Sequence, residues 1–377
     1  MESSSPIGST LTETQDKILS LLPLFTGSIS IVGSGQIIYM VLTSEKKTPY
    51  RRILLGLSSC DILSSMHLIL QPYLMPSGTA VWAFGNEATC DALGFFQQLA
   101  SCDIWYNTML SFYFLLHVTV RYAVLENNFA RTYEPWMHLF SLGWPLITAS
   151  IGAGLGVYNV LGVGHGCWVA DYGCNAEGEC YSRMIGWIFL GIPSFLFFVA
   201  ILVNNVIVFC HVRSTLKRSM AYTREFRNPM TASTVDEAGI TRTKRQQQEM
   251  DPQAKRIRAV ATQAFLYVGA FFACGIWTIA LRIADAYSDP DGGGYYPLLV
   301  VNAIMRPLQG FCNFFIYIRP AYIRAREGFP RETRKWAFQR ALHGNSVKPS
   351  NVRSTKQTRT MSFDMQADLA ASDDGQD

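Results

Sequence analysis

Hydrophobic residues fall in long runs along this chain, separated by short polar stretches. A run of about 17–25 apolar residues with few charges has the length of a membrane-spanning helix. Seven such runs occur, at 18–43, 52–75, 90–120, 136–158, 184–210, 259–283 and 295–318. Only helices and closed barrels satisfy their backbone in lipid, and these runs lack the alternation of barrel strands. The pattern therefore predicts an all-α membrane protein, a seven-transmembrane helix bundle.

Composition agrees with this prediction. Of the 377 residues, 49% are hydrophobic and 16% are charged, whereas charged residues make up roughly 25% of a soluble domain. Lys and Arg gather in the connections 44–52, 121–135 and 211–258 and in the tail from 319, and the intervening loops are acidic instead. Since positive loops stay on the cytosolic side, we expect the N-terminus outside and the C-terminus in the cytosol.

These features divide the chain into four parts. They are an extracellular segment (1–17), the bundle (18–318, with a cytosolic loop at 213–258), a juxtamembrane amphipathic basic segment (319–343) and a tail (344–377). Residues 319–343 mix aromatic and basic side chains, which suits a helix on the inner leaflet; a solvated basic tail is the alternative. No cleavable signal peptide is expected, because the first apolar run is too long for one.

The tail is rich in Ser and Thr among basic residues and then turns acidic, which indicates a disordered segment. Its candidate phosphorylation sites are Ser350, Ser354, Thr355, Thr358, Thr360 and Ser362. Phosphate would reverse the local charge, and kinases and arrestin-like proteins are the partners expected there. Disorder without a regulatory role is the alternative.

The nine cysteines divide by position. Those inside apolar runs are expected to be small buried packing residues: Cys60, Cys102, Cys210, Cys274 and Cys312. Four others lie on the expected outer side, where disulfides persist. Four cysteines permit three pairings; we favour Cys90–Cys167 together with Cys174–Cys180.

Three charges fall inside the apolar runs at similar depth: Asp61, Asp103 and Arg306. An isolated charge at the bilayer centre costs roughly 2.5–3.5 kcal/mol, so we expect Arg306 to pair with Asp61 or with Asp103. Gln309, Asn313 and Tyr317 follow Arg306 at helical spacing and would share its face. Such a polar core is either a fixed clamp or part of a switch, and the weak stabilisation by buried ion pairs favours the switch.

Several short motifs together resemble the G-protein-coupled receptors. They are Asp61 in LGLSSCDIL, Cys90 with Cys167 in GCW, Trp144-Pro145, Pro193, Trp277 in CGIW, and Asn313–Tyr317 in NFFIY. The stretches PLQGFCNFFIY (307–317) and QAFLYVGAFF (263–272) look most like the slime-mould cyclic-AMP receptor-like branch and related protist receptors. The resemblance implies a plasma-membrane receptor whose bundle rearranges on binding a ligand and drives nucleotide exchange on a heterotrimeric G protein.

The chain departs from the family pattern at two motifs. Phe314 replaces the proline of the seventh-helix motif, and Val120 replaces the acid before Arg121-Tyr122. Arg121 is therefore expected further into the cytosol, in contact with lipid or the G protein rather than locking helices. The candidate G-protein-facing residues are Arg121, Tyr122, Arg256 and Arg258.

The ligand is expected to be an extracellular small molecule of unknown identity. Aromatic rings and the few outer cations are the candidate ligand-binding residues: Trp105, Tyr106, Arg183, Trp187, Trp277, Arg282 and Tyr295. Aromatic rings can stack on a ligand ring, although packing and interface anchoring are their alternative roles. The resemblance suggests a cyclic nucleotide, whereas the acidic outer loops favour a cationic or neutral ligand.

Other functions fit the sequence less well. A retinal cofactor would need a lysine in the last run, which has none. We expect no cofactor, because His67, His117 and His138 lie at different depths and do not form a metal site. No catalytic residues and no nucleic-acid partner are expected. The alternative function is a transporter or ion channel that uses Asp61, Asp103 and Arg306, since midplane charges also mark ion paths.

Overall fold

The computed structural model of the chain describes residues 11–45, 48–119, 131–161, 166–170, 181–225, 252–287 and 296–343. In chain order the elements are α1 (Glu13–Leu42), α2 (Pro49–Leu74), α3 (Glu87–Leu99), α4 (Cys102–Thr119), α6 (Glu134–Leu155), β1 (Tyr158–Val160), β2 (Cys167–Val169), α7 (Tyr181–Gly186), the π-helical turn η1 (Trp187–Gly191), α8 (Ile192–Glu225), α10 (Pro252–Tyr287), α11 (Tyr296–Met305), α12 (Gln309–Gly328) and α13 (Arg334–His343).

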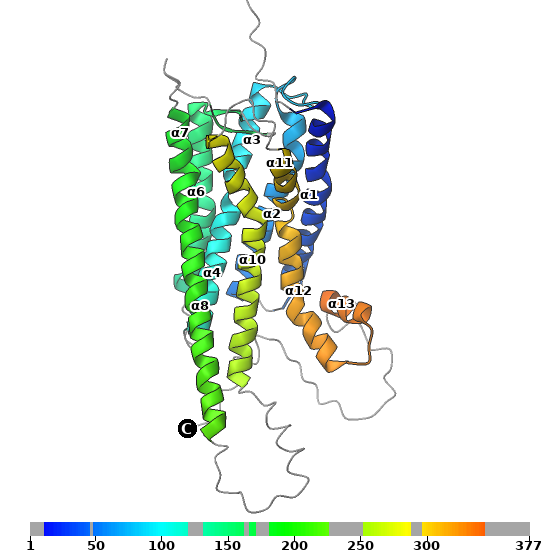
Figure 1. The fold of residues 1–377 in the computed structure, drawn as a ribbon, viewed down its shortest axis with the longest axis vertical. Helices are drawn as coiled ribbons and strands as arrows, with labels where there is room; N and C mark the ends of the chain where they lie inside the picture. The colour runs from blue at the N-terminus through cyan, green and yellow to red at the C-terminus, as the bar shows by residue number, and fades with distance from the viewer. Residues whose placement is uncertain are drawn as a thin grey trace, which may run out of the picture.

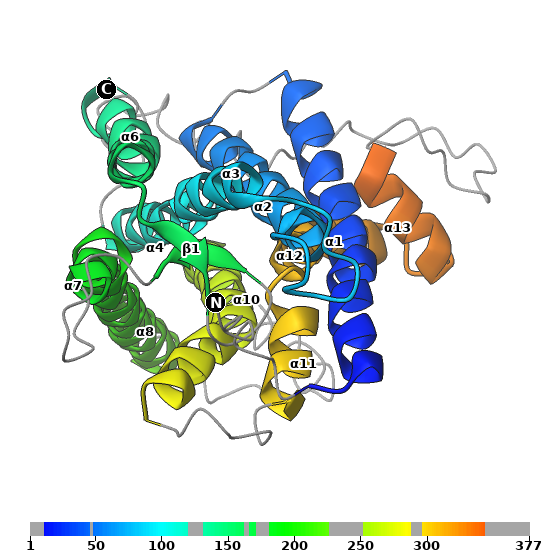
Figure 2. The ribbon, with the colours of Figure 1, turned by 90° about the horizontal axis from the view of Figure 1, so that it is seen from above.

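The long helices lie side by side along the longest axis of the molecule (Figure 1). Strands β1 and β2 form an antiparallel hairpin that lies over the bundle when it is viewed from above (Figure 2). We call this the hairpin end and the opposite one the α13 end. Helix α8 extends to Glu225 and α10 begins at Pro252, so helical structure continues into both ends of the expected loop 213–258.

The main core lies between α1, α2, α4, α10 and α12. Its most deeply buried members include Ile37, Leu54, Leu110 and Tyr267. Small residues bring α1 and α12 unusually close: a Cβ at Gly310 would meet the side chains of Ser30 and Ser34. The Gly310 backbone N–H also donates to Ser30 Oγ over 3.1 Å. Small residues are the usual means by which membrane helices approach closely, so this contact fits a membrane bundle.

Two of the expected continuous helices are broken. The run 90–120 forms α3 and α4, separated at Ala100–Ser101, where Ser101 and Asp103 donate backbone hydrogen bonds three residues back. The run 295–318 forms α11 and α12, which meet at a bend of 41°. Pro307 lies in this bend; it has no N–H to donate and disfavours helical geometry at the residue before it. Arg306 therefore lies in a turn, and the expectation that it continues one helix with Gln309 and Asn313 is wrong.

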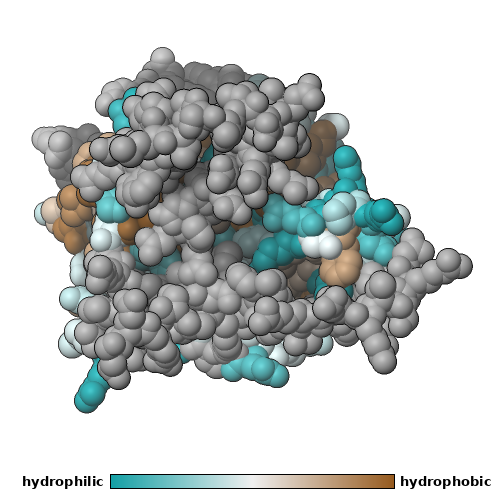
Figure 3. All heavy atoms as spheres, turned by 90° about the horizontal axis from the view of Figure 1, so that it is seen from below, coloured by the Kyte–Doolittle hydropathy of each residue, from teal (hydrophilic) through white to brown (hydrophobic). Residues whose placement is uncertain are grey.

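The sides of the bundle expose many large apolar residues. On α8 alone Phe195, Leu196, Leu202, Val203, Val206 and Phe209 are each at least half exposed. A soluble monomer rarely shows so much contiguous apolar surface. Viewed from the α13 end, hydrophobic residues of the described part show at its left and upper-right edges, and a group of hydrophilic residues shows on the right (Figure 3). The lateral surface is therefore suited to lipid.

Among the described residues, four helical stretches are long and apolar enough to cross a membrane: α1, α2, Met184–Lys217 and Ile257–Leu281. A fifth is added if the bent pair α11–α12 is one span. This supports an integral membrane protein. The count of seven spans and the orientation of the termini stay predictions.

At the α13 end, α13 packs on the last turns of α12. Trp336 and Ala337 of α13 are buried against Ala325. The guanidinium of Arg340 lies over the rings of Phe329 and Trp336, at 4.8 and 5.2 Å from their centroids. The basic segment 319–343 thus contains a packed helix, and at least this arginine contacts aromatic rings.

The described residues contain two disulfides. Cys90 bonds to Cys167, with Cα atoms 5.4 Å apart, as the sequence favoured. Cys60 bonds to Cys102, which links α2 to α4. The sequence interpretation of these two as unbonded packing residues is therefore wrong: the break before α4 places Cys102 opposite Cys60. Cys174 and Cys180 lie outside the described residues.

Candidate functional site

A cavity of about 90 Å³ lies under the hairpin, between α1, α2, α3, α10 and α11. Its lining is mostly apolar, from Leu19, Pro23, Leu68, Pro72, Leu161, Leu281, Leu299, Ala303 and Pro307. Five polar side chains complete it: Gln71, Gln97, Thr278, Asn302 and Arg306. An apolar pocket with a few convergent polar groups is the usual form of a small-molecule site.

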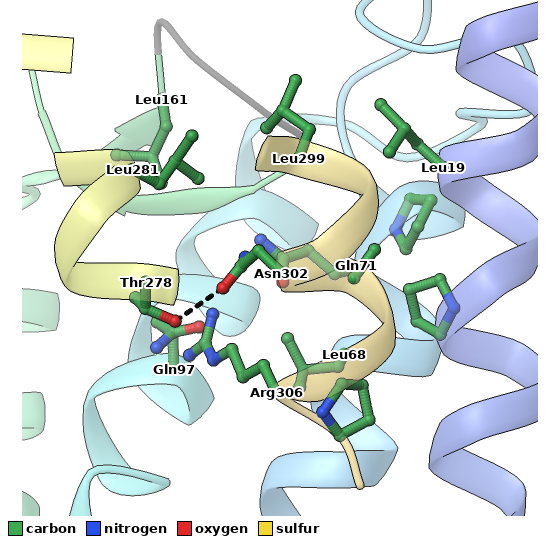
Figure 4. Close-up of a pocket in the computed structure, with 14 residues that line it drawn as sticks. Leu19, Leu68, Gln71, Gln97, Leu161, Thr278, Leu281, Leu299, Asn302 and Arg306 are labelled. Carbon is green, nitrogen blue, oxygen red and sulfur yellow. Dashed lines mark hydrogen bonds between the residues drawn. The ribbon is translucent and has the colours of Figure 1, made fainter. Parts of the chain in front are cut away.

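The polar groups of the cavity converge from different helices (Figure 4). Thr278 of α10 donates its hydroxyl proton to the Asn302 side-chain oxygen of α11 over 2.7 Å. The Arg306 side chain extends from the turn after α11 towards Gln97 and Thr278. Arg306 and Pro307, both in the bend between α11 and α12, line the cavity.

The hairpin is fixed over the cavity by covalent and polar contacts. The Cys90–Cys167 disulfide ties β2 to α3. Trp168 Nε1 donates to Gln98 Oε1 over 3.0 Å, and Gln98 Nε2 in turn donates to Thr148 Oγ1 over 2.9 Å. Gln98 is fully buried. One amide side chain therefore joins the hairpin to α3 and α6, next to the break that begins α4.

A polar core continues from the cavity towards the α13 end. Asn313 Nδ2 donates to Asp61 Oδ2 over 2.9 Å, and both residues are buried. Asp103 and His67 lie within electrostatic range of Arg306. Of the two aspartates expected to pair with Arg306, Asp61 thus has Asn313 as a partner and Asp103 is the one on which the Arg306 charge acts. The switch role of this core stays a prediction.

A second polar network lies at the α13 end of the bundle. Arg52, at the start of α2, donates two hydrogen bonds to the Glu134 carboxylate, from Nε to Oε1 and from Nη2 to Oε2, the latter over 2.6 Å. His138 Nε2 lies 3.6 Å from Glu134 Oε1, and His138 Nδ1 is hydrogen-bonded to the Tyr106 hydroxyl over 2.9 Å. Burial raises the pKa of Glu134, but the hydrogen bonds from Arg52 and His138 outweigh it and lower the pKa below 4.5.

The expected ligand-binding residues do not gather at the cavity. Trp105 packs edge-on against Phe197, with ring centroids 4.2 Å apart, and Tyr106 bonds to His138. Trp187 is 58% exposed on the outside of the bundle, and Trp277 donates to a carbonyl of its own helix. Packing or interface roles fit these four described side chains better than ligand contact.

The other predicted site residues are placed as follows. Arg258 is exposed on α10, and Gln309 and Asn313 are buried on α12 with half-buried Tyr317. The side chains of Arg183, Arg256 and Arg282 lie outside the described part of the structure, as do Arg121, Tyr122, Tyr295 and all the tail phosphorylation candidates. Over the described residues no group of three or more His, Cys, Asp or Glu is placed to hold a metal ion.

Sequence reasoning missed the amide residues of the cavity. Gln71, Gln97 and Asn302 each interrupt an apolar run, and a buried amide in lipid must find a partner or line a cavity. That interruption was the available signal. An amide within an apolar run does not say which helices meet, so this signal alone does not place these residues in one cavity.

Two known proteins are similar to this chain. The chain is 26% identical over 195 residues to the "Ascaroside receptor GPR3" of Arthrobotrys oligospora, a match to 49% of this chain and 43% of that receptor. It is a distant homologue of a G-protein-coupled receptor. The structure of squid rhodopsin superposes with a TM-score of 0.59 at 16% identity, over 94% of this chain and 91% of rhodopsin.

The two comparisons bear on different properties of this receptor homologue. The rhodopsin match shows the fold, and the fungal match shows distant homology to a receptor over less than half of that protein's length. No protein-family model matches the chain. The comparisons therefore support the resemblance to G-protein-coupled receptors, whereas the slime-mould branch within them stays a prediction.

Proposed function

We propose that this chain is a seven-helix cell-surface receptor that binds an extracellular small molecule and activates a heterotrimeric G protein. The hairpin end faces outside and the α13 end faces the cytosol, in agreement with the basic connections expected there. The observation that carries the proposal is a rhodopsin-like bundle with a polar-lined cavity under its disulfide-tied hairpin.

The ligand site is the cavity under the hairpin, and the polar core below it relays occupancy to the other end. Arg306 belongs to both, since it lines the cavity and acts electrostatically on Asp103. A ligand that moves Arg306 therefore changes the balance of charge inside the bundle. Such differential contact is what a ligand needs in order to shift a conformational equilibrium.

The G protein binds at the α13 end, where α8 and α10 project furthest (Figure 1). Exposed Arg258 of α10 is the described member of the residues expected to face it. Kinases and arrestin-like proteins act on the Ser and Thr residues of the tail. Cyclic nucleotides, from the sequence resemblance, and ascarosides, from the name of the fungal relative, are the two ligand classes to try first.

The test is guanine-nucleotide exchange on purified heterotrimers in membranes that contain the chain. Cyclic nucleotides, ascarosides, amines and short organic acids are added in turn to the outer side. We expect exchange to depend on the chain and to fall when Arg258→Glu reverses the exposed charge. Lys335→Glu, on the exposed face of α13, is the matched charge reversal and should retain exchange. Ion flux through liposomes with no exchange would instead support the transporter alternative.

A further inference from the structure

The charge that lines the cavity under the hairpin is positive. Among its lining residues, all within the described part of the chain, Arg306 is the only charged side chain. Gln71, Gln97 and Asn302 have amide groups that donate hydrogen bonds, and nothing acidic lines the wall. From these observations we propose that the cavity binds a small monocarboxylate, with its carboxylate on Arg306 and its hydrocarbon part on the leucine wall. The inference rests on the proposed receptor function, because it names the ligand class of the same site.

The charge balance favours a carboxylate over a phosphate. A guanidinium forms paired hydrogen bonds with either anion. However, a phosphate monoester carries about −1.5 to −2 charges at neutral pH, whereas a carboxylate carries one and therefore adds less negative charge beside Arg306 and the nearby Asp103. Burying a surplus charge is costly. Because Asp103 lies within electrostatic range of Arg306, a carboxylate bound to Arg306 also changes the charge around this aspartate, and binding is coupled to the polar core.

The remaining wall defines the rest of the ligand. Leu19, Leu68, Leu281 and Leu299 surround the polar groups from α1, α2, α10 and α11 (Figure 4). Roughly 10–15 Å³ of such space holds one water-sized group, so 90 Å³ holds roughly six to nine. Butyrate, with four carbons and two oxygens, lies at the lower end of that range. A much longer acid needs the cavity to widen, and a larger ligand would enter with its carboxylate end only.

The hairpin backbone at Gly166 closes the cavity above Gln71. A Cβ at Gly166 would meet the side-chain nitrogen of Gln71, so the hairpin backbone lies directly on one of the amide-bearing side chains. The disulfide at the neighbouring Cys167 holds this contact in place. The Gln71 amide therefore lies beneath the hairpin backbone, at the hairpin side of the cavity.

The experiment measures thermal unfolding of the purified full chain in lipid nanodiscs, at fixed pH and ionic strength. The probes are butyrate, butyramide, n-butylamine and butyl phosphate at equal concentration. A ligand that binds only the native state stabilises it by RT ln(1 + L/Kd), where L is the ligand concentration, and so raises the unfolding temperature. We expect butyrate to stabilise the chain more than the other three do. Arg306→Gln should weaken butyrate binding about tenfold to a hundredfold, the value of a hydrogen bond to a charged group.

A second variant keeps the proposal testable if Arg306→Gln does not fold. Leu299→Ala removes three carbons from the wall, so the best acid in the series from acetate to octanoate should become longer. Leu110→Ala, in the core away from the cavity, is the matched truncation and should leave the preferred length unchanged.

Each outcome decides the proposal. Equal or stronger stabilisation by the amide, the amine or the phosphate overturns the carboxylate assignment, as does a preferred length that Leu299→Ala does not change. No stabilisation by any acid overturns it as well. None of these results decides the receptor function, because nucleotide exchange on a G protein is a separate measurement. Loss of exchange with retained butyrate binding would reject the receptor and leave the carboxylate site.

Discussion

The Arg52–Glu134 pair offers a stability test with a worked magnitude. The change is Arg52→Gln, which removes both hydrogen bonds to a carboxylate that is only 6% exposed, whereas Arg52 itself is 37% exposed. Breaking a fully buried pair costs about 3–5 kcal/mol, and exposure of the arginine reduces that value. We therefore expect Arg52→Gln to lower the free energy of unfolding by about 2 kcal/mol, or the unfolding temperature by about 4 °C.

Acid should erase this difference. The folded-state pKa of Glu134 is lowered from 4.5, so its contribution is fully present above about pH 4.5 and is lost as the pH falls through the folded pKa. Thermal unfolding in nanodiscs between pH 7 and pH 3 measures the effect. The stability gap between wild type and Arg52→Gln should be constant at high pH and shrink below about pH 4.5.

The control is Lys17→Gln, which removes the exposed ion pair between Lys17 and Glu13. Exposed pairs contribute little, so this variant should unfold at the wild-type temperature. A double-mutant cycle of Arg52→Gln with Glu134→Gln should show a coupling of about 1–2 kcal/mol. Additive losses, or an Arg52→Gln shift no larger than that of Lys17→Gln, would refute the reasoning.

Two other contacts give further expected outcomes. Gln98→Leu should destabilise the chain by about 2 kcal/mol, because it removes the acceptor of the half-buried Trp168 N–H and the donor to Thr148. Thermal unfolding checks this, and equal stability of Gln98→Leu and wild type would contradict it. Peptide mapping without reductant should find Cys60 linked to Cys102, and alkylation of both thiols in unreduced, denatured protein would show that the bond is absent.

Much of the bundle follows from hydrophobic run length alone. Each of the seven apolar runs overlaps one or more helices of the structure, and the favoured Cys90–Cys167 bond is present. Run length does not reveal breaks inside a run. Pro307 is visible in the sequence, but neighbouring helices often accommodate a proline within a membrane helix. The proline alone therefore does not predict the 41° bend.

The site was harder to predict than the fold. Position within the apolar runs identifies Asp61, Asp103 and Arg306 as charges at similar depth in the bundle. It does not say which of their atoms are in contact. Asn313 and Asp61 are far apart in sequence and are joined only by the packing of α12 on α2. Aromatic residues were favoured as ligand contacts because they can stack, whereas Trp105 and Tyr106 have other partners.

The measurement that most directly tests the central claim is guanine-nucleotide exchange on a heterotrimeric G protein, in membranes with and without this chain at matched surface expression. A receptor of this fold predicts exchange that requires the chain, rises with a ligand added on the hairpin side and falls with Arg258→Glu. Exchange that is identical with and without the chain, across G proteins of every class and the full ligand panel, would contradict the account.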